Sequence, residues 1–300
     1  MNTRMIIKTV VAIALLGLLS SCAPTSSNES AQTFAADPQA QTNIIGGADS
    51  TAEYQKANGI VGIMMVTEDQ FGRQLSAVCT GSLIAPKVVL TAAHCMVLSK
   101  GTKLVAFLIL LDKNLDNIME EISKNDLTHV RSVNKVVRHE AYLSGRGTNN
   151  DIGLLGFDGA LPPDYKLAVR APAQLARELR KGAVVTLAGF GVSKYEKNSA
   201  TGEFEGEGDG LLRQVNGIKV LSLSATGQEI TLDQSQGRGA CHGDSGGPAY
   251  LVDPVSKKNM LVGVTSRGID PNGSCDVGAI YTGVMGYSKW IDDSLKKIAQ

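Results

Sequence analysis

The sequence has few aromatic residues and no excess of either charge. Phe, Trp and Tyr make up 5% of its 300 residues, and 29 Lys and Arg stand against 29 Asp and Glu. Because the formal net charge is zero, the chain offers no general attraction for a polyanion, and we expect no nucleic-acid partner. The 33 glycines favour many turns between short strands over long helical bundles.

No apolar run in the sequence is long enough to be interpreted first as a membrane-spanning helix. Arg4 and Lys8 precede a short apolar stretch over residues 10–19, which is typical of a signal peptide. The stretch ends in LSSC, which resembles the bacterial lipobox and implies lipidation of Cys22. The alternative is an ordinary secretory signal cut nearby, with Cys22 removed. We therefore interpret residues 1–22 as the signal peptide of an exported protein.

Large apolar residues are almost absent from residues 23–43, which are rich in Ser, Ala, Thr, Gln and Pro. Such a segment cannot bury enough apolar surface to offset the conformational entropy of the chain. We predict a disordered linker or propeptide over residues 23–43 and a folded domain over residues 44–300.

Five cysteines are present. If Cys22 is lipidated or removed, four remain, and an even number in an exported protein indicates two disulfides. Four cysteines allow three pairings, among which spacing alone does not choose. A zinc site is the alternative, because His94 adjoins Cys95 and His242 adjoins Cys241, but the sequence lacks a CxxC or HxxxH spacing.

Three short segments carry the residue types that nucleophilic catalysis needs. They are TAAHC around His94, NDIGLL around Asp151 and GDSGGP around Ser245. Each alone is typical of a structural His, a turn Asp or an ordinary Gly-rich turn. Together they indicate catalysis, because a Ser hydroxyl needs a base such as His, and a buried carboxylate orients that His. Glycines beside the Ser let backbone N–H groups approach a developing oxyanion.

The glycines around Ser245 also fit the nucleophile elbow of the α/β-hydrolases, where the His follows the Ser along the chain. The four histidines are His94, His129, His139 and His242, so none follows Ser245. The elbow therefore lacks its base, and the order His, Asp, Ser remains.

These motifs resemble those of the chymotrypsin-like serine peptidases, from Ile44 to the C-terminus. The resemblance implies an all-β fold of two packed six-stranded antiparallel barrels with a short C-terminal helix, and the recurring short apolar segments suit it. The segments that carry it lie at residues 44–47 (IIGG), 91–95, 139–142, 150–152, 189–191 (GFG), 243–248, 281–282 and 290–291.

The resemblance also implies a role for each site residue. Ser245 attacks the scissile carbonyl, His94 transfers the proton, and Asp151 holds the imidazole in the useful tautomer. The N–H groups of Gly243 and Ser245 form the oxyanion hole, and Ser266 supports Asp151 by a hydrogen bond. The protein is then a serine-type endopeptidase acting on proteins or peptides, with no cofactor or metal. A pseudoprotease that only binds, or an adhesive zymogen, is the alternative.

Two disulfide pairings follow from the same resemblance. Cys79–Cys95 would brace the loop that carries the catalytic His, and Cys241–Cys275 would brace the wall of the substrate pocket. Loops of these lengths would stabilise the fold by roughly 3–4 kcal/mol each in the chain-entropy model.

The resemblance further implies that the protein is made as a zymogen. Cleavage between Asn43 and Ile44 would free an α-amino group that pairs with the buried Asp244. Asn43 departs from the basic residue that often precedes this cut, so the activating protease is left open. If Cys22 carries lipid, the precursor is anchored at the bacterial envelope, and cleavage would release the enzyme from the membrane.

The positions that align with the substrate pocket of the family carry no charge, so we do not expect strict preference for Arg or Lys. An open apolar pocket favours a Leu, Met or aromatic side chain. Arg267 and His242 nearby would attract an acidic residue instead, unless both point to solvent. The pocket positions are Gly239, Ala240, Gly268 and Ala279.

Two further segments give structural expectations. Residues 193–210 are polar, Gly-rich and acidic, and we predict a flexible loop there. An apolar stripe with helical spacing near the C-terminus predicts a terminal helix packed on the second barrel. The stripe consists of Tyr287, Trp290, Ile291, Leu295 and Ile298.

Overall fold

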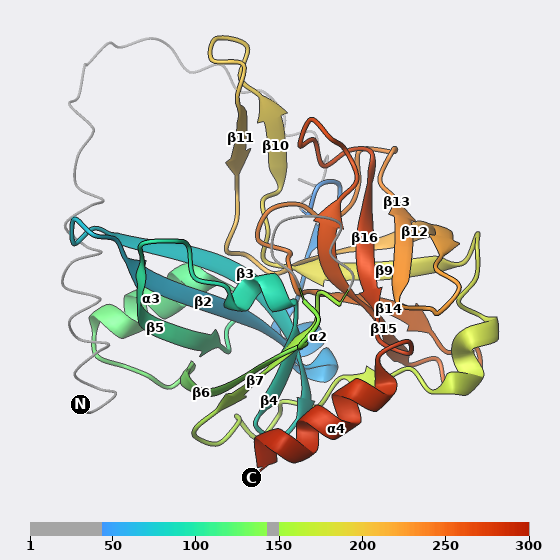
Figure 1. Ribbon diagram of the computed structural model, residues 1–300, viewed down its shortest axis with the longest axis horizontal. Helices are drawn as coiled ribbons and strands as arrows, with labels where there is room; N and C mark the ends of the chain where they lie inside the picture. Colours follow the sequence, from blue (N-terminus) through green and yellow to red (C-terminus); the bar gives the residue numbers. More distant parts are fainter. Residues whose placement is uncertain (1–43, 143–149, 300) are drawn as a thin grey trace, which may run out of the picture.

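The computed structural model describes residues 44–142 and 150–299 and consists of two antiparallel β-barrels side by side (Figure 1). The first barrel closes in the strand order β2-β3-β4-β7-β6-β5. Its strands are β2 (Ile60–Glu68), β3 (Gln74–Ala85), β4 (Val88–Thr91), β5 (Lys103–Leu110), β6 (Val130–Arg138) and β7 (Gly153–Phe157).

The second barrel follows in the chain and closes through the pairing of β9 with β12. The short strands β1 (Ala48–Asp49) and β8 (Val169–Arg170) extend it at its edges. The predicted fold of two six-stranded barrels is therefore confirmed. The six strands are β9 (Val184–Gly189), β12 (Arg213–Leu223), β13 (Glu229–Asp233), β14 (Pro248–Val252), β15 (Asn259–Gly268) and β16 (Gly278–Gly283).

Each barrel is filled by aliphatic side chains from its own strands. Val61, Val89 and Ile109 are fully buried in the first barrel, and Leu232 and Val262 are fully buried in the second. Successive side chains of a strand point to opposite faces of the sheet. Each strand therefore contributes to the interior of its barrel at every second position.

Helices are short and few within the described ranges. Thr51 caps α2 (Ala52–Asn58) through its hydroxyl, which accepts from the Tyr54 amide at 3.1 Å. The remaining helical segments are α3 (Leu115–Ser123), α4 (Ser288–Ala299) and the two short 3-10 turns η1 (Ala93–Met96) and η2 (Ala173–Arg177).

The predicted C-terminal helix is present as α4, but the prediction that it packs on the second barrel is wrong. α4 packs on β6 and β7 of the first barrel, where Ile298 belongs to the apolar core (Figure 1). The end of the helix lies over Gly156 of β7, whose Cβ position is 3.6 Å from Cγ2 of Ile298. Lys135 on β6 then donates to the Ile298 carbonyl at 2.8 Å.

The segment predicted as a flexible loop at residues 193–210 contains a β-hairpin that projects from the molecule (Figure 1). Its strands are β10 (Lys194–Lys197) and β11 (Phe204–Glu207). Tyr195 stacks on Phe204 across the hairpin, with ring centroids 5.2 Å apart. This cross-strand aromatic pair supplies the order that the polar composition did not predict.

The predicted signal peptide (1–22), the linker (23–43) and the lipidation site Cys22 lie outside the described residues. Within residues 44–142 and 150–299, no helix is long and apolar enough to cross a membrane.

The core of the first barrel gives a stability test on one strand. Ile109→Ala removes a fully buried side chain of β5, so we expect a loss of about 2–5 kcal/mol in the free energy of unfolding, measured by urea denaturation. Leu104→Ala on the same strand is the control. Its side chain is 48% exposed, so its change should stay within about 0.5 kcal/mol. Equal losses in both variants would contradict the assigned core.

Candidate active site

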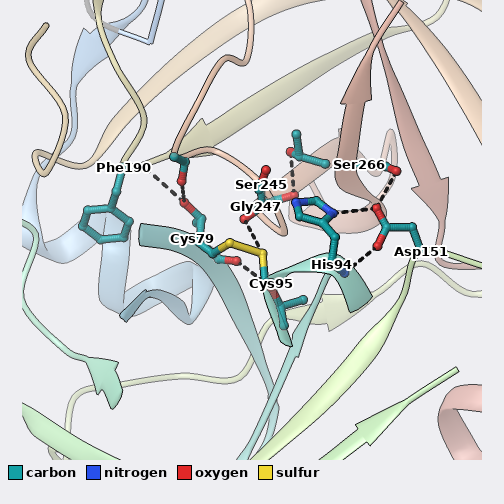
Figure 2. Close-up of a disulfide and its surroundings, with 12 residues drawn as sticks. Cys79, His94, Cys95, Asp151, Phe190, Ser245, Gly247 and Ser266 are labelled. Atoms are coloured by element: carbon teal, nitrogen blue, oxygen red, sulfur yellow. Dashed lines mark hydrogen bonds and ion pairs between the residues drawn. A yellow bond between two sulfur atoms is a disulfide. The ribbon is translucent and has the colours of Figure 1, made fainter. Parts of the chain in front are cut away.

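His94 lies directly after strand β4, in the turn η1. The next residue, Cys95, is joined by a disulfide to Cys79 of β3, with the two Cα atoms 6.3 Å apart (Figure 2). The Thr91 hydroxyl donates to the Thr80 carbonyl at 2.9 Å, which ties β4 to β3 just before the turn. The turn that carries His94 is thus fixed on both sides.

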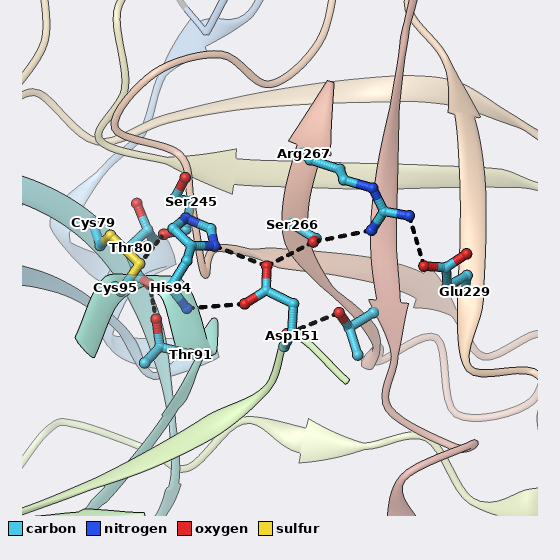
Figure 3. A network of polar contacts seen from close by, with 11 residues as sticks. Cys79, Thr80, Thr91, His94, Cys95, Asp151, Glu229, Ser245, Ser266 and Arg267 are labelled. Atoms are coloured by element: carbon cyan, nitrogen blue, oxygen red, sulfur yellow. Dashed lines mark hydrogen bonds and ion pairs between the residues drawn. A yellow bond between two sulfur atoms is a disulfide. The ribbon is translucent and has the colours of Figure 1, made fainter. Parts of the chain in front are cut away.

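Asp151 precedes β7 and is 2% exposed. Its Oδ2 atom lies 2.8 Å from Nδ1 of His94 and accepts from the Ser266 hydroxyl at 2.6 Å (Figure 3). Its Oδ1 atom accepts from the His94 amide at 2.9 Å, and its carbonyl accepts from the Thr282 hydroxyl at 2.8 Å. The sequence-predicted His, Asp and supporting Ser therefore lie within one hydrogen-bonded chain.

The charge of Asp151 is stabilised despite its burial. Burial alone would raise its pKa, but the hydrogen bond and the charge of the His94 side chain, the Ser266 hydroxyl and the His94 amide together lower its pKa below the usual value. Asp151 is therefore an anion at neutral pH, which stabilises an imidazolium on His94 and favours the Nδ1–H tautomer when His94 is neutral.

Ser245 lies in a tight turn pressed against the first barrel. The Thr80 amide donates to the Ser245 carbonyl at 2.8 Å, and the Thr80 hydroxyl donates to the Gly243 carbonyl at 3.0 Å. Gly246 adopts a φ of 79°, and a Cβ on it would lie 1.9 Å from Oγ1 of Thr91. Only glycine permits this approach, which places the Ser245 side chain beside the His94 ring (Figures 2 and 3).

The backbone amides of the turn divide into two groups. Those of Asp244, Gly246 and Gly247 donate to carbonyls within the protein. Those of Gly243 and Ser245, the two predicted oxyanion donors, have no acceptor in the described part of the chain. Two unpaired amides beside a Ser hydroxyl suit an incoming anionic oxygen.

Asp244 is buried behind this turn and is 1% exposed. Burial raises its pKa to about 7, although the Cys241 and Gly191 amides, each at 2.8 Å from the carboxylate, and the charge of Arg213 act in the opposite direction. These contacts therefore do not fully offset the cost of burying the carboxylate, and a further cation would stabilise its charge.

Ile44, the predicted partner of Asp244, is fully buried in the core of the second barrel. Its φ of 45° lies in the left-handed region, which is strained for a β-branched residue. The next residue, Ile45, accepts from the Gly239 amide at 2.8 Å. The segment around residue 44 is thus docked next to the site while it is still joined to Asn43.

Comparison with known proteins gives the family of the chain. The profile of the family described as Trypsin matches residues 50–291. The chain belongs to the trypsin family. It is 30% identical to lectizyme of Glossina austeni over 243 residues, which cover 74% of this chain and 79% of lectizyme. It is 28% identical to brachyurin of Leptuca pugilator over 221 residues, which cover 71% of this chain and 85% of brachyurin.

A solved structure agrees with the fold. The chain resembles HL collagenase with a TM-score of 0.62 and 21% identity, over 84% of this chain and 99% of that one. As a member of the trypsin family, the protein is a serine endopeptidase, a hydrolase of peptide bonds.

A cavity of about 290 Å³ opens beside Ser245 of this trypsin-family protein. Ala240, Gly268 and Ala279, three of the four predicted pocket positions, line it, but Gly239 does not. Two charged side chains also line it, Arg267 and Asp270. Asp270 accepts from the amides of Asn272 and Ser274 at 3.0 and 3.1 Å.

Gly239 packs against the side chain of Gln234, a residue that the sequence did not indicate. Gln234 is 1% exposed, accepts from the Ala240 amide at 2.9 Å and donates to the Ala240 carbonyl at 3.0 Å. It also donates to the Cys275 carbonyl, beside the disulfide Cys241–Cys275. A Cβ on Gly239 would lie 2.3 Å from this side chain, so Gln234 occupies the space that a larger residue at 239 would need.

A second cavity, of about 500 Å³, is lined by both Ser245 and His94. His242 lines both cavities, and its ring lies 4.7 Å from the ring of Tyr195 on β10. Apolar side chains of β2 and β3, among them Ile63 and Val78, form its opposite wall. The hairpin β10–β11 thus borders the active-site cleft.

Three polar residues of the site were missed by sequence reasoning: Thr80, Gln234 and Thr282. Each acts through a contact with a residue far away in the chain. Thr80 and Gln234 lie outside the motifs, and Thr282 lies in the segment 281–282, to which the sequence assigned no role in the site. The possible zinc clusters at His94 and His242 contain sulfur atoms that are bonded in the disulfides, so these sulfurs are not available as thiolate ligands.

The raised pKa of Asp244 predicts an unusual pH dependence of stability in the uncut chain. Between the usual value of 3.8 and about 7, folded Asp244 keeps a proton that the unfolded chain has lost. Raising the pH through this window therefore lowers the free energy of unfolding, by up to about 1.4 kcal/mol per pH unit, and the fall ends above about 7.

The measurement compares urea denaturation from pH 5 to pH 8 in a Ser245→Ala background, which prevents self-digestion. Asp244→Asn should remove most of the slope, whatever its effect on absolute stability. Glu178→Gln, at an exposed carboxylate, is the control and should keep the slope. An unchanged slope in Asp244→Asn would show that Asp244 is charged throughout this pH range.

Proposed function

We propose that this serine endopeptidase works by an acyl-enzyme mechanism with Ser245 as the nucleophile. The observation that carries the proposal is the hydrogen-bonded chain from Ser266 through Asp151 to His94, which ends beside Ser245. His94 takes the proton of the Ser245 hydroxyl as the oxygen attacks, and then gives it to the leaving amine. Asp151 stabilises the imidazolium that forms between these two transfers.

The oxyanion of the tetrahedral intermediate is bound by the amides of Gly243 and Ser245. Their lack of an internal acceptor in the described residues supports this role. Such donors are already oriented before the reaction, and losing one of them typically lowers turnover by about 10²–10³.

The cavity of about 290 Å³ receives the side chain of the residue before the scissile bond. Ala240 and Ala279 favour an apolar side chain such as Leu, Met or an aromatic ring, and strict preference for Arg or Lys is not expected. Gln234 supports this preference, because it fills the space behind Gly239 with a neutral amide whose hydrogen bonds are used within the wall.

Activation requires cleavage between Asn43 and Ile44, after which the new amine of Ile44 pairs with Asp244. Two observations support it. Asp244 is a buried carboxylate without full compensation, and its raised pKa shows that a cation would be favoured there. Ile44 holds a strained φ that exists only while a residue precedes it, so cleavage releases strain of about 1–3 kcal/mol.

The proposed route to the envelope rests on the sequence alone. Residues 1–22 export the chain, Cys22 carries the lipid, and residues 23–43 connect the anchor to the domain. Cleavage after Asn43 by an activating protease would then release a secreted or periplasmic enzyme, whose partners are its protein or peptide substrates.

Labelling with a fluorophosphonate probe tests the nucleophile. The cleaved protein should be labelled at Ser245, and Ser245→Ala should lose both labelling and peptide hydrolysis, with turnover reduced by at least about 10³. Ser222→Ala, at an exposed serine on β12, is the control and should remain active. Labelling that persists in Ser245→Ala would contradict the assignment.

N-terminal sequencing tests the activation step. Active enzyme should begin with Ile-Ile-Gly-Gly at residue 44, because only that amine reaches Asp244. Asp244→Asn should be cut at the same bond and yet gain little activity, since the amine has no carboxylate to pair with. Full activity in a form that starts at any other residue would contradict this mechanism.

A further inference from the structure

The hydrogen-bonded chain of the triad continues beyond Ser266 to an ion pair (Figure 3). Nη1 of Arg267 lies 3.5 Å from the Ser266 hydroxyl oxygen, and Nη2 donates to Oε1 of Glu229 at 2.8 Å. The side chains of Arg267 and Glu229 are 29% and 26% exposed, so bulk water screens the pair only in part. Five side chains in a row, from Glu229 to His94, thus join two charges to the catalytic base.

The strands of the second barrel bring this ion pair to the triad. β13 and β15 flank β16, and Glu229 on β13 lies opposite Thr282 on β16, whose hydroxyl binds the Asp151 carbonyl. The pairing of β15 with β16 shifts register between Thr265 and Arg267. A bulge of this kind re-aims a side chain, which explains how the side chains of the adjacent residues Ser266 and Arg267 can contact one another.

The guanidinium orients the Ser266 hydroxyl. Arg267 can only donate, so its N–H faces a lone pair of the Ser266 oxygen. The single proton of Ser266 is then left for Asp151, and hydrogen bonds in such a chain strengthen one another. Glu229 holds the guanidinium in place and offsets its positive charge.

The two charges have opposite effects on the protonated base. The positive charge of Arg267 disfavours an imidazolium on His94, and the negative charge of Glu229 favours it. Other titratable groups that face Asp151 are Tyr142 and Tyr287. Burial raises the pKa of both, the charge of Asp151 adds to the rise in Tyr142, and the charges of Glu229 and then Asp151 add to it in Tyr287, so both are neutral below about pH 10.

We propose that Arg267 and Glu229 are positioning residues of the catalytic triad, which set the Ser266–Asp151 hydrogen bond and balance the charge that the His94 imidazolium meets. The proposal rests on the proposed function, because it assigns the pair a role in the same proton transfer. It also gives Arg267 an acidic partner within the chain rather than in the substrate.

The test is the pH profile of kcat/KM for the cleaved enzyme on one peptide substrate. Arg267→Gln removes the positive charge and should move the acidic limb to higher pH by about 0.5 pH unit, less than the 1–3 units of a charge in direct contact. Glu229→Gln should move it to lower pH by a similar amount, and the double variant should lie near the parent.

Arg170→Gln is the matched control, because Arg170 forms a similar surface ion pair with Asp292 at 2.6 Å outside the triad. It should leave the limb in place. Arg267→Lys keeps the charge and should stay closer to the parent than Arg267→Gln. Shifts of equal sign in Arg267→Gln and Glu229→Gln, or no shift in either, would overturn the proposal, because loss of packing alone does not produce opposite signs.

A second readout separates this inference from the proposed function. In Ser245→Ala protein, the low-field proton resonance of the His94 Nδ1–H group can be followed by NMR against pH without any turnover. Its titration midpoint should move to higher pH in Arg267→Gln and to lower pH in Glu229→Gln. Failure of fluorophosphonate labelling in the parent would refute Ser245 as nucleophile, whereas normal labelling with unmoved NMR midpoints would refute the positioning role alone.

Discussion

The buried carboxylate of Asp151 is the constraint on which the rest of the site depends. A carboxylate that is 2% exposed persists as an anion only when donors surround it. The first barrel supplies the His94 side chain and amide, and the second supplies the Ser266 hydroxyl. The same contacts that satisfy this charge therefore dock the two barrels, and stability and chemistry share one set of hydrogen bonds.

Close backbone approach is the second requirement of the site. Thr80 donates from its amide to Ser245 and from its hydroxyl to Gly243, and it also accepts from the Phe190 amide at 3.1 Å. One small residue of the first barrel, through its amide and its hydroxyl, thus holds three backbone groups near Ser245. The absence of a Cβ at Gly246 is what brings these groups within hydrogen-bonding distance.

The fold and the residues of the proposed triad could be predicted from the sequence, because His94, Asp151 and Ser245 each lie in a short motif with its own local chemistry. Contacts that depend on how distant strands meet could not. The bulge that aims Ser266 and Arg267 depends on strand register, and the position of α4 depends on its contacts with β6 and β7 of the first barrel. The hairpin at residues 193–210 owes its order to one aromatic pair within a polar segment.

The division of the site between the barrels has a consequence for the cell that makes this protein. His94 and Asp151 belong to the first barrel, whereas Ser245 and Ser266 come from the second and later one. Contacts between residues so far apart in the chain form only after long loops have closed, so they are slow to form. A nascent chain, or one with a single finished barrel, carries no complete set of reacting groups. Assembly of both barrels is therefore one condition for proteolysis, and the proposed cleavage after Asn43 is a second condition that follows it.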